Sequence, residues 1–360
     1  MIYKLLRPFL FLSGAEQAHN RILRLGHALG ASGAGRILGA WYAYSDPRLR
    51  TSLWGLQLPN PVGIAAGFDK DGVLRDFLPA LGVGFVEIGT VTPLPQIGNP
   101  KPRLFRIPQD EAIINRMGFN GAGMDAVAEN LSRARIPAIV GINIGKNKAT
   151  PLQDAVRDYE KCFARLADAA SFLVVNVSSP NTPHLRELQN KEPLKALLRT
   201  LQGMNRALPR EKPLLLKIAP DLSDSQLDDI IEIVRETGLA GIIAVNTTTS
   251  REHLSVPQDL VYSLGEGGLS GRPLKRRATE VLRYLYKKSG GTIPLIGVGG
   301  IFTGRDAYER IRAGASLVEL YTSLVYEGPE IVMRIKQDLA RCLKRDGFKS
   351  VADAVGVDVR

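Results

Sequence analysis

Residues 172–183 read FLVVNVSSPNTP, beginning as a buried strand and ending as a polar loop. The segment from Phe172 to Val175 is apolar and rich in β-branched residues, as the strands of a parallel sheet require. Two serines, two asparagines and two prolines then fall within the next eight positions. Hydrogen-bonding side chains at the C-terminal end of a strand are typical of the active site of a β/α barrel. A simple turn explains this stretch equally well, so the choice depends on the rest of the chain.

From residue 56 onward the sequence alternates between apolar segments and amphipathic helical ones. About eight strand–helix repeats over roughly 270 residues are typical of a (β/α)8 TIM barrel, an α/β fold. The predicted helices include residues 154–170, 223–237, 273–288 and 304–313. The predicted strands are residues 62–66, 85–89, 138–144, 172–177, 214–218, 241–246, 294–298 and 317–321.

Polar residues or glycines recur at the C-terminal end of nearly every predicted strand. One such residue is ordinary in a loop, but turns alone do not explain the recurrence at the same end of each strand. The sequence therefore predicts one site at the barrel mouth. The recurring residues are Gly67, Lys70, Thr90, Asn143, Asn176, Ser179, Lys217, Asn246, Thr247, Gly300, Tyr321 and Thr322.

Two further segments lie outside the repeat. Residues 91–120 follow the second strand, and the runs 103–107 and 112–115 predict a small β insertion over the barrel mouth. Residues 1–50 are predicted to form an N-terminal helical extension, and residues 51–360 the barrel domain. In the extension, Ala18, Ile22, Leu25 and Leu29 recur at helical spacing. Gly26, Gly30, Gly33 and Gly35 predict a loosening of the helix.

The role of the extension has two interpretations. Basic residues outnumber acidic ones in it, and a small basic amphipathic helix is typical of a membrane interface. The alternative is a helical cap packed on the barrel. The basic residues of the extension are Lys4, Arg7, Arg21, Arg24, Arg36, Arg48 and Arg50.

The composition limits the kinds of partner that the protein is expected to bind. The net charge of +11 over 360 residues favours an anionic partner. Aromatic residues make up only 6% and the basic residues are dispersed, so we expect no nucleic-acid binding. Cys162 and Cys342 lie far apart and the histidines are scattered, which predicts neither a disulfide nor a metal site. No apolar run is long enough to span a membrane, and no targeting sequence is evident.

The chemistry of the predicted mouth suggests two ligands. Glycines at 267–271 and 297–300, with residues 321–322, lie where this fold binds phosphate. Together with residues 65–67 and Thr90, they fit flavin mononucleotide (FMN). The asparagines suit a small planar ligand with amide and carbonyl groups. Lys70 suits a ligand carboxylate, and Ser179 is the nearest candidate proton acceptor.

Six motifs resemble those of the dihydroorotate dehydrogenases. They are AAGFDKDG at 65–72, EIGTVTP at 87–93, NRMGFN at 115–120, NIGKNK at 143–148, NVSSPNT at 176–182 and GLSGRP at 268–273. The likeness runs from about residue 2 to the last helix. Ser179 and the extension resemble class 2, the quinone-dependent, membrane-associated branch; the soluble class 1 branch uses a cysteine base and lacks the extension.

The resemblance implies that Ser179 takes the C5 proton of dihydroorotate while C6 passes hydride to flavin N5. The implied substrate site consists of Lys70, Asn115, Arg116, Met117, Gly118, Phe119, Asn176, Asn181, Asn246 and Thr247. The implied site for one FMN consists of Ala66, Gly67, Lys70, Thr90, Asn143, Asn176, Lys217, Val245, Gly271, Gly300, Tyr321 and Thr322. The implied quinone tunnel in the extension is matched by His19, Arg103 and Tyr321.

The resemblance therefore implies oxidation of (S)-dihydroorotate to orotate in de novo pyrimidine (UMP) biosynthesis, with a membrane quinone as acceptor. The implied location is the cytoplasmic side of a bacterial inner membrane, against anionic phospholipid. The nearest alternative is a soluble flavin oxidoreductase of the same superfamily that uses fumarate or NAD. That alternative predicts a cysteine base and no extension. A third interpretation is a lipid-surface module on an inactive barrel.

Overall fold

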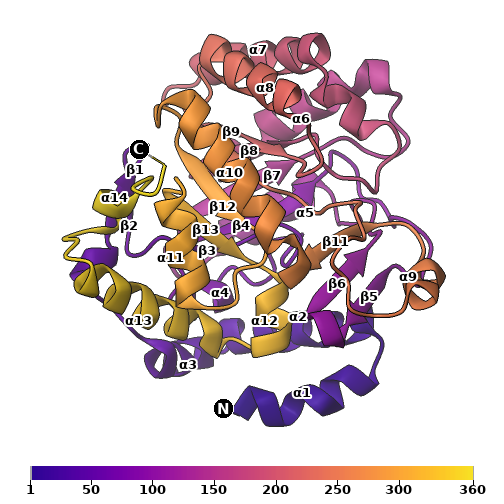
Figure 1. Cartoon of the computed structure of the whole chain (residues 1–360). Coiled ribbons are helices and arrows are strands. Elements are labelled where there is room, and N and C mark those ends of the chain that lie inside the picture. Colours follow the sequence, from indigo (N-terminus) through magenta and orange to yellow (C-terminus); the bar gives the residue numbers. More distant parts are fainter. Residues whose placement is uncertain (1, 360) are drawn as a thin grey trace.

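The computed structural model describes residues 2–359, apart from the side chains of residues 2, 36 and 38; Arg36, counted above among the basic residues, is one of these. Eight parallel strands close into a barrel in the order β10-β12-β13-β3-β4-β7-β8-β9 (Figure 1). Each strand matches a predicted one to within two residues at either end, so the predicted TIM barrel is confirmed. The strands are β3 (Val62–Ile64), β4 (Phe85–Val91), β7 (Val140–Ile144), β8 (Phe172–Asn176), β9 (Leu214–Ile218), β10 (Gly241–Ala244), β12 (Leu295–Val298) and β13 (Leu317–Leu320).

Helices surround the barrel. Ser223 and Thr303 form capping boxes at the starts of α8 and α11, which explains why these two helices begin where the sequence predicts. The helices after the extension are α4 (Phe77–Ala80), α5 (Met124–Ser132), α6 (Ala155–Leu166), α7 (Lys191–Arg206), α8 (Asp224–Thr237), α9 (Gln258–Leu264), α10 (Lys275–Ser289), α11 (Gly304–Arg312), α12 (Thr322–Glu327), α13 (Glu330–Arg345) and α14 (Val351–Ala354). The 3-10 helices are η1 (Pro47–Leu49), η2 (Pro108–Asp110), η3 (Leu152–Asp154), η4 (Leu185–Gln189) and η5 (Arg272–Leu274).

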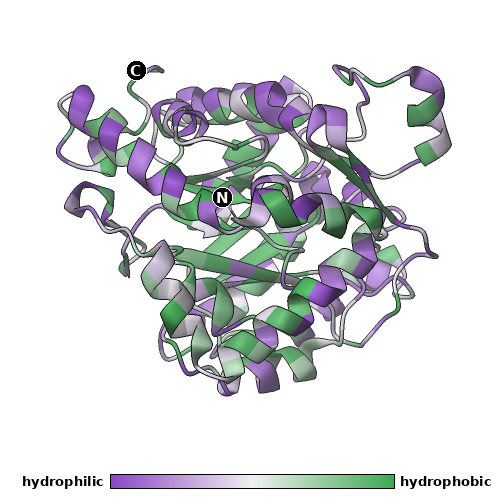
Figure 2. Cartoon of the chain, turned by 90° about the horizontal axis from the view of Figure 1, so that it is seen from below, coloured by the Kyte–Doolittle hydropathy of each residue, from purple (hydrophilic) through white to green (hydrophobic). Residues whose placement is uncertain are grey.

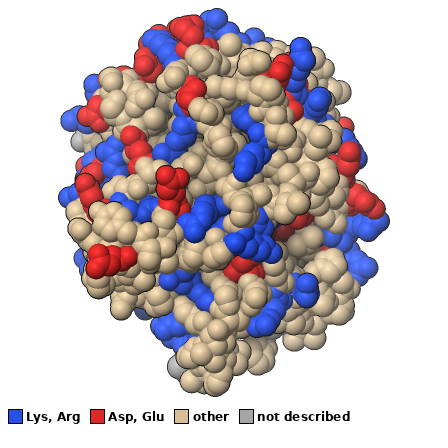
Figure 3. Space-filling view, turned by 90° about the vertical axis from the view of Figure 1, so that its right-hand side faces the viewer, with Lys and Arg blue, Asp and Glu red and all other residues tan. Residues whose placement is uncertain are grey.

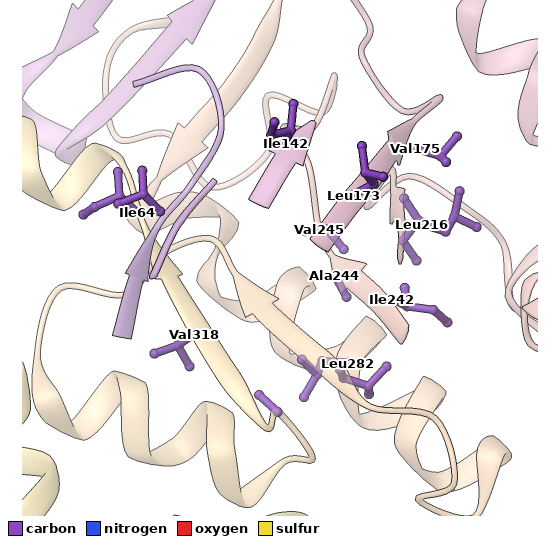
Figure 4. Close-up of a cluster of buried hydrophobic side chains, with 14 of the residues drawn as sticks. Ile64, Ile142, Leu173, Val175, Leu216, Ile242, Ala244, Val245, Leu282 and Val318 are labelled. Carbon is purple, nitrogen blue, oxygen red and sulfur yellow. The ribbon is translucent and has the colours of Figure 1, made fainter. Parts of the chain in front are cut away.

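The main core lies between the strands and the surrounding helices. Outward-facing strand residues such as Ile64, Leu173 and Leu216 are fully buried there, and Leu282 of α10 belongs to the same cluster (Figure 4). Because both faces of the strands are covered, the strands are mostly apolar, with few polar or charged residues. This burial is why the strands can be recognised in the sequence.

A second, smaller core fills the lower half of the barrel interior. The rings of Phe85 and Phe172 lie at its centre, 6.0 Å apart in an edge-on arrangement. Gly63 and Gly141 face these rings, and neither site has room for a side chain. Polar inward-facing residues therefore begin only above this apolar layer, which places the site near the C-terminal ends of the strands.

Gly141→Ala is expected to destabilise the protein by about 1–3 kcal/mol, because a methyl group would overpack the interior. Its Cβ would lie 2.2 Å from the Phe172 ring. Urea unfolding monitored by circular dichroism measures the effect. Gly203→Ala is the control, since nothing lies within 4 Å of its added methyl group. An unchanged urea midpoint for Gly141→Ala would contradict this packing.

A hairpin that the sequence analysis missed closes the bottom of the barrel. It consists of β1 (Thr51–Leu53) and β2 (Leu56–Leu58), joined by Trp54 and Gly55, both with positive φ. The indole of Trp54 donates a hydrogen bond to the carbonyl of Ala240 at 2.7 Å. Both strands have three residues and are only partly buried, so neither forms a distinct apolar run in the sequence.

The predicted β insertion is present but larger than expected. Strands β5 (Leu104–Ile107) and β6 (Ala112–Asn115) form the antiparallel pair. A third strand, β11 (Gly268–Gly271), pairs with β6 to give the order β11-β6-β5. This pairing joins segments about 150 residues apart, so no local pattern announces it.

The extension forms three helices along one side of the barrel: α1 (Ile2–Leu12), α2 (Ala15–Ala31) and α3 (Ala34–Tyr42) (Figure 1). The predicted loosening at Gly26 and Gly30 is wrong, because both glycines lie inside α2. A Cβ at Gly26 would lie 2.7 Å from Leu74, and one at Gly30 would lie 3.2 Å from Asp76. These glycines allow α2 to pack closely on the segment that leads into α4.

The extension exposes several large apolar side chains among polar ones. The side of the molecule that carries it shows apolar stretches beside polar ones along the helices (Figure 2). Leu5, Phe9 and Leu12 of α1 are 74%, 71% and 85% exposed, and Trp41 of α3 is 71% exposed. On an adjacent side, Lys and Arg are dispersed among Asp and Glu, above largely uncharged surface where α1 lies (Figure 3). Within residues 2–359 no helix combines the length and the apolarity that crossing a membrane requires.

Candidate active site

The C-terminal ends of the barrel strands open into a pocket of about 1020 Å³, counted out to its mouth. The insertion and the loops after most of the strands contribute to its walls. The structure brings most of the predicted site residues together here. Those that line the pocket are Ala66, Gly67, Lys70, Thr90, Asn115, Met117, Gly118, Phe119, Asn176, Ser179, Asn181, Lys217, Val245, Asn246, Thr247, Gly271, Gly300, Tyr321 and Thr322.

A chain of hydrogen bonds fixes the amides on one side of the pocket. Thr90 Oγ1 donates to Asn143 Oδ1 at 2.6 Å and accepts from Asn176 Nδ2 at 2.8 Å. Ser178 Oγ donates to Asn176 Oδ1 at 2.9 Å and accepts from Asn246 Nδ2 at the same distance. Asn143 lies fully buried behind the pocket wall. Each amide therefore has a set orientation, as selective recognition of a polar ligand requires.

Lys217 and Glu319 line the pocket floor, and the fully buried Glu87 lies behind it in contact with Lys217. Lys217 Nζ of β9 lies 2.5 Å from Glu87 Oε2 of β4 and 3.6 Å from Glu319 Oε2 of β13. Glu87 also accepts hydrogen bonds from Asn143 Nδ2 at 2.7 Å and from the Ala66 amide at 2.9 Å. Burial lowers the pKa of Lys217, but the charges of Glu87 and Glu319 outweigh burial and raise it. Lys217 is therefore a fixed positive charge under the pocket.

The two glutamates were missed as site residues by the sequence analysis. Both stand in otherwise apolar strands, Glu87 between Val86 and Ile88 and Glu319 between Val318 and Leu320. A charged residue in the middle of a buried strand is a usable signal, since such groups are almost never buried without a partner. Lys217 has the same pattern and was recognised by it.

The loop after β8 holds Ser179 at the pocket wall, only 6% exposed. The backbone amide of Asn181 donates to Ser179 Oγ at 3.2 Å. Arg186 ties this loop to the loop after β10, donating to the carbonyls of Ser178 and Thr247, each at 3.0 Å. These hydrogen bonds of Arg186 hold the motif of residues 176–182 in place.

Lys70 stands at another wall, next to the insertion. Its ammonium donates to Asn120 Oδ1. Burial, and next the charge of Arg103, lower the pKa of Lys70 to about 7. An anionic ligand would stabilise the charged form of a lysine whose pKa is lowered in this way.

Glycines and hydroxyls make the rim near β12 and β13. Gly271 and Gly300 have φ values of +106° and +71°, which favour glycine. Ser270 Oγ and Thr322 Oγ1 lie 2.8 Å apart, and among the described residues the buried Ser323 Oγ has no hydrogen-bond partner. Hydroxyls and exposed backbone amides of this kind suit a phosphate group. Ser323 was missed by the sequence analysis, and Ser270 was included only as part of the stretch 267–271.

The three quinone candidates lie between α2 and the pocket wall. The rings of His19 and Phe68 are edge-on at 5.3 Å, and those of Phe68 and Tyr321 are edge-on at 5.9 Å. This aromatic series runs from the extension to the pocket wall. Arg103 pairs with Glu16 of α2 at 2.7 Å. Neither His19 nor Arg103 lines the pocket itself.

Arg116 is the predicted substrate residue whose side chain the structure places elsewhere. Its guanidinium donates to the carbonyls of Leu264 at 2.6 Å and Glu266 at 2.8 Å. It also lies over the Phe105 ring, 4.5 Å from the centroid. The family resemblance implied Arg116 as a substrate residue, but its side chain contacts the loop around α9.

Comparison with known proteins agrees with this geometry. The family model for dihydroorotate dehydrogenase matches residues 48–343. A Rhodospirillum rubrum protein named dihydroorotate dehydrogenase (quinone) is 53% identical over 362 residues, covering 99% of this chain and 95% of that protein. The protein of that name from Natronomonas pharaonis is 48% identical and covers 99% of both chains. The crystal structure of the Eimeria tenella enzyme in complex with ferulenol has a TM-score of 0.85 at 40% identity and covers 96% of each chain. This chain is therefore a member of the dihydroorotate dehydrogenase family.

Proposed function

We propose that this protein oxidises (S)-dihydroorotate to orotate with a quinone as electron acceptor, through bound FMN, in de novo pyrimidine biosynthesis. One observation carries the proposal. A single pocket combines the rim of glycines and hydroxyls, the Lys217 floor and the Ser179 wall with its ordered asparagines. The names of the relatives support the reaction and the acceptor.

The residues of the pocket fit FMN. Ser270, Gly271, Gly300, Thr322 and Ser323 would hold its phosphate, and the Ser323 hydroxyl, which no other described residue engages, is an open donor for it. The ring would lie toward Lys217, with Ala66, Gly67, Thr90, Asn143, Asn176, Val245 and Tyr321 completing the site. When bound, FMN supplies an acceptor for the two electrons of a hydride.

The substrate would lie between Lys70 and Ser179. Asn115, Asn181, Asn246 and Thr247 would bind its amide and carbonyl groups, together with the backbone of residues 117–119. Asn181 Nδ2 already donates to Asn115 Oδ1 at 3.0 Å, which orients both amides. Ser179 would remove the C5 proton as general base. The buried Thr182 hydroxyl, which has no hydrogen-bond partner among the described residues, is our candidate for relaying that proton.

The lowered pKa of Lys70 predicts a pH dependence of orotate binding. Since its pKa is lowered to about 7, we expect orotate to bind with constant affinity below pH 7. Above pH 7 Lys70 loses its proton in the free protein, so the affinity falls by up to about tenfold per pH unit. Titration of the flavin absorbance with orotate measures this. Lys70→Met should bind weakly at every pH, with the Lys70 inflection gone.

The control for Lys70 is Lys148→Met, which removes an exposed lysine that contacts Asn99 rather than the pocket. Its orotate affinity should follow the wild-type pH curve. Wild-type affinity in Lys70→Met, or a wild-type curve that is flat from pH 6 to 9, would remove Lys70 from the substrate site.

We also propose that the extension admits the quinone and holds the protein on anionic phospholipid, as a peripheral protein on the cytoplasmic side of a bacterial inner membrane. The exposed apolar residues of α1 support this role, as do the exposed arginines Arg21 and Arg24 of α2. The aromatic series from His19 to Tyr321 supports a route to the pocket. Residues 1–50 would then be a unit distinct in role from the barrel domain of residues 51–360.

Leu5→Ser with Phe9→Ser is expected to reduce co-sedimentation with anionic vesicles by tenfold or more, because burying one such side chain contributes about 1.5–3 kcal/mol. Reduction of flavin by dihydroorotate should stay at the wild-type rate, since both residues lie outside the pocket. Leu260→Ser with Tyr262→Ser is the matched control, as these residues of α9 are 44% and 76% exposed. Equal sedimentation by all three proteins would contradict docking through α1.

A further inference from the structure

Glu319 of β13 is a buried pocket residue with no defined role in the proposed reaction. It lines the pocket floor and is 1% exposed. Among the described residues, neither of its carboxylate oxygens has a hydrogen-bond partner. Lys217 Nζ is 3.6 Å from Glu319 Oε2, beyond hydrogen-bonding distance, and the Glu87 carboxylate is its other charged neighbour.

Glu87, by contrast, is a buried carboxylate with a full set of hydrogen-bond donors. It accepts from Lys217, from Asn143 and from the Ala66 amide. Lys217 therefore has its strong contact with Glu87, and a single positive charge faces two acids. A second carboxylate there would be a buried, uncompensated negative charge, which is costly.

Among the described residues, Lys217 is the one positive charge found to act on Glu319. On the neighbouring strands, Val298 of β12 and Gly63 of β3 stand in register with it. Across the barrel, Lys217 and Glu87 are the charged groups that influence it. Burial, followed by the charge of Glu87, raises the pKa of Glu319 well above its usual range, although Lys217 opposes both. The floor is then neutral in sum, with one proton held on Glu319.

We propose that Glu319 is a proton-exchanging acid that couples the charge of the pocket floor to the redox state of the flavin bound above it. This inference rests on the proposed function. Glu319 is protonated when the ring carries the extra negative charge of its reduced form, and it ionises at a lower pH when the ring is oxidised. Between those two titrations, Glu319 takes up a proton on reduction and releases it on reoxidation.

The step balances in protons and electrons. Dihydroorotate loses two electrons with its hydride and one proton through Ser179. Solvent supplies a separate proton that adds to the Glu319 carboxylate and forms an O–H bond. When the quinone removes the two electrons, that O–H bond breaks and the proton returns to solvent. Glu319 is thus a tuning residue and takes no part in breaking the C–H bonds of the substrate.

The test is the midpoint potential of the flavin as a function of pH in the holoenzyme, measured with redox dyes. Each proton taken up with two electrons adds about 30 mV per pH unit to the slope. In a window of pH, the wild-type slope should be steeper than that of Glu319→Gln by this amount. Gln keeps the size of the side chain and cannot ionise. Glu211→Gln, which removes an exposed acid in a loop, should keep the wild-type curve.

Parallel lines for the wild type and Glu319→Gln from pH 5 to 10 would overturn the proposal. If Glu319→Gln holds no flavin, infrared difference spectra of the wild type decide instead. A carbonyl band of a protonated carboxyl group, sensitive to D2O and changing with flavin reduction inside the window, is expected; its absence overturns the proposal. Failure of dihydroorotate to reduce the flavin would refute the proposed function alone, because the dye titration does not need that substrate.

Discussion

Ser179→Ala is expected to slow the reduction of bound flavin by dihydroorotate by about 10²–10⁴-fold, the usual contribution of a general base. The loss should fall on the chemical step. Ser179 Oγ accepts from the Asn181 amide at 3.2 Å, but its removal leaves the bonds of Asn181 to Asn115 and of Asn176 to Thr90 in place. Flavin stoichiometry and orotate affinity should therefore change little. Stopped-flow absorbance at saturating dihydroorotate measures the rate.

Two further variants serve as comparisons for the test of Ser179 as general base. Ser179→Cys should keep part of the rate, because a thiol can also accept a proton. Ser132→Ala, at an exposed position at the end of α5, should match the wild type. Flavin reduction at the wild-type rate in Ser179→Ala would show that another group takes the proton.

Lys217→Met is expected to lower the stability by about 3–5 kcal/mol, because it breaks a buried ion pair and leaves the Glu87 carboxylate without its counter-charge. The same change removes the positive charge of the pocket floor, so we also expect flavin binding to be abolished. Lys217 lies 2.5 Å from Glu87, and the two side chains are 5% and 0% exposed. Urea unfolding of the flavin-free protein measures the stability, and absorbance measures the flavin content.

The reason for that loss can be checked with a second substitution. Adding Glu87→Gln to Lys217→Met removes the unpaired charge, so much of the lost stability should return while flavin binding does not. Lys287→Met, at an exposed position late in α10, controls for the loss of one positive charge. A cost below about 0.5 kcal/mol for Lys217→Met, as for an ordinary surface change, would contradict a charged floor.

The barrel and much of its pocket were predictable from sequence because both follow from short-range patterns. Strand β8 is apolar from Phe172 to Val175, since helices cover its outer face and Phe172 fills the interior. Where the apolar run stops, at Asn176, the strand has reached the pocket. The same reading applied to β9 identifies Lys217. The motifs then linked these strand ends to a known family.

The features that were missed depend on contacts between distant segments. Strand β11 is recognisable only once Gly268 stands opposite Asn115 of β6. Gly26 has the composition of a helix breaker, yet it is required where Leu74 packs against α2. Lys217 contacts both Glu87 and Glu319, and the three residues come from three separate strands. No spacing along the chain encodes that arrangement.

The most direct test of the account is anaerobic mixing of the purified holoenzyme with dihydroorotate, followed by the addition of one acceptor at a time. We predict a yellow protein whose flavin absorbance bleaches with dihydroorotate and returns rapidly with a ubiquinone analogue, but not with fumarate or NAD. Absence of flavin, or a flavin that dihydroorotate leaves oxidised, would contradict the proposed reaction. Faster reoxidation by fumarate or NAD than by the quinone would favour the soluble-enzyme alternative.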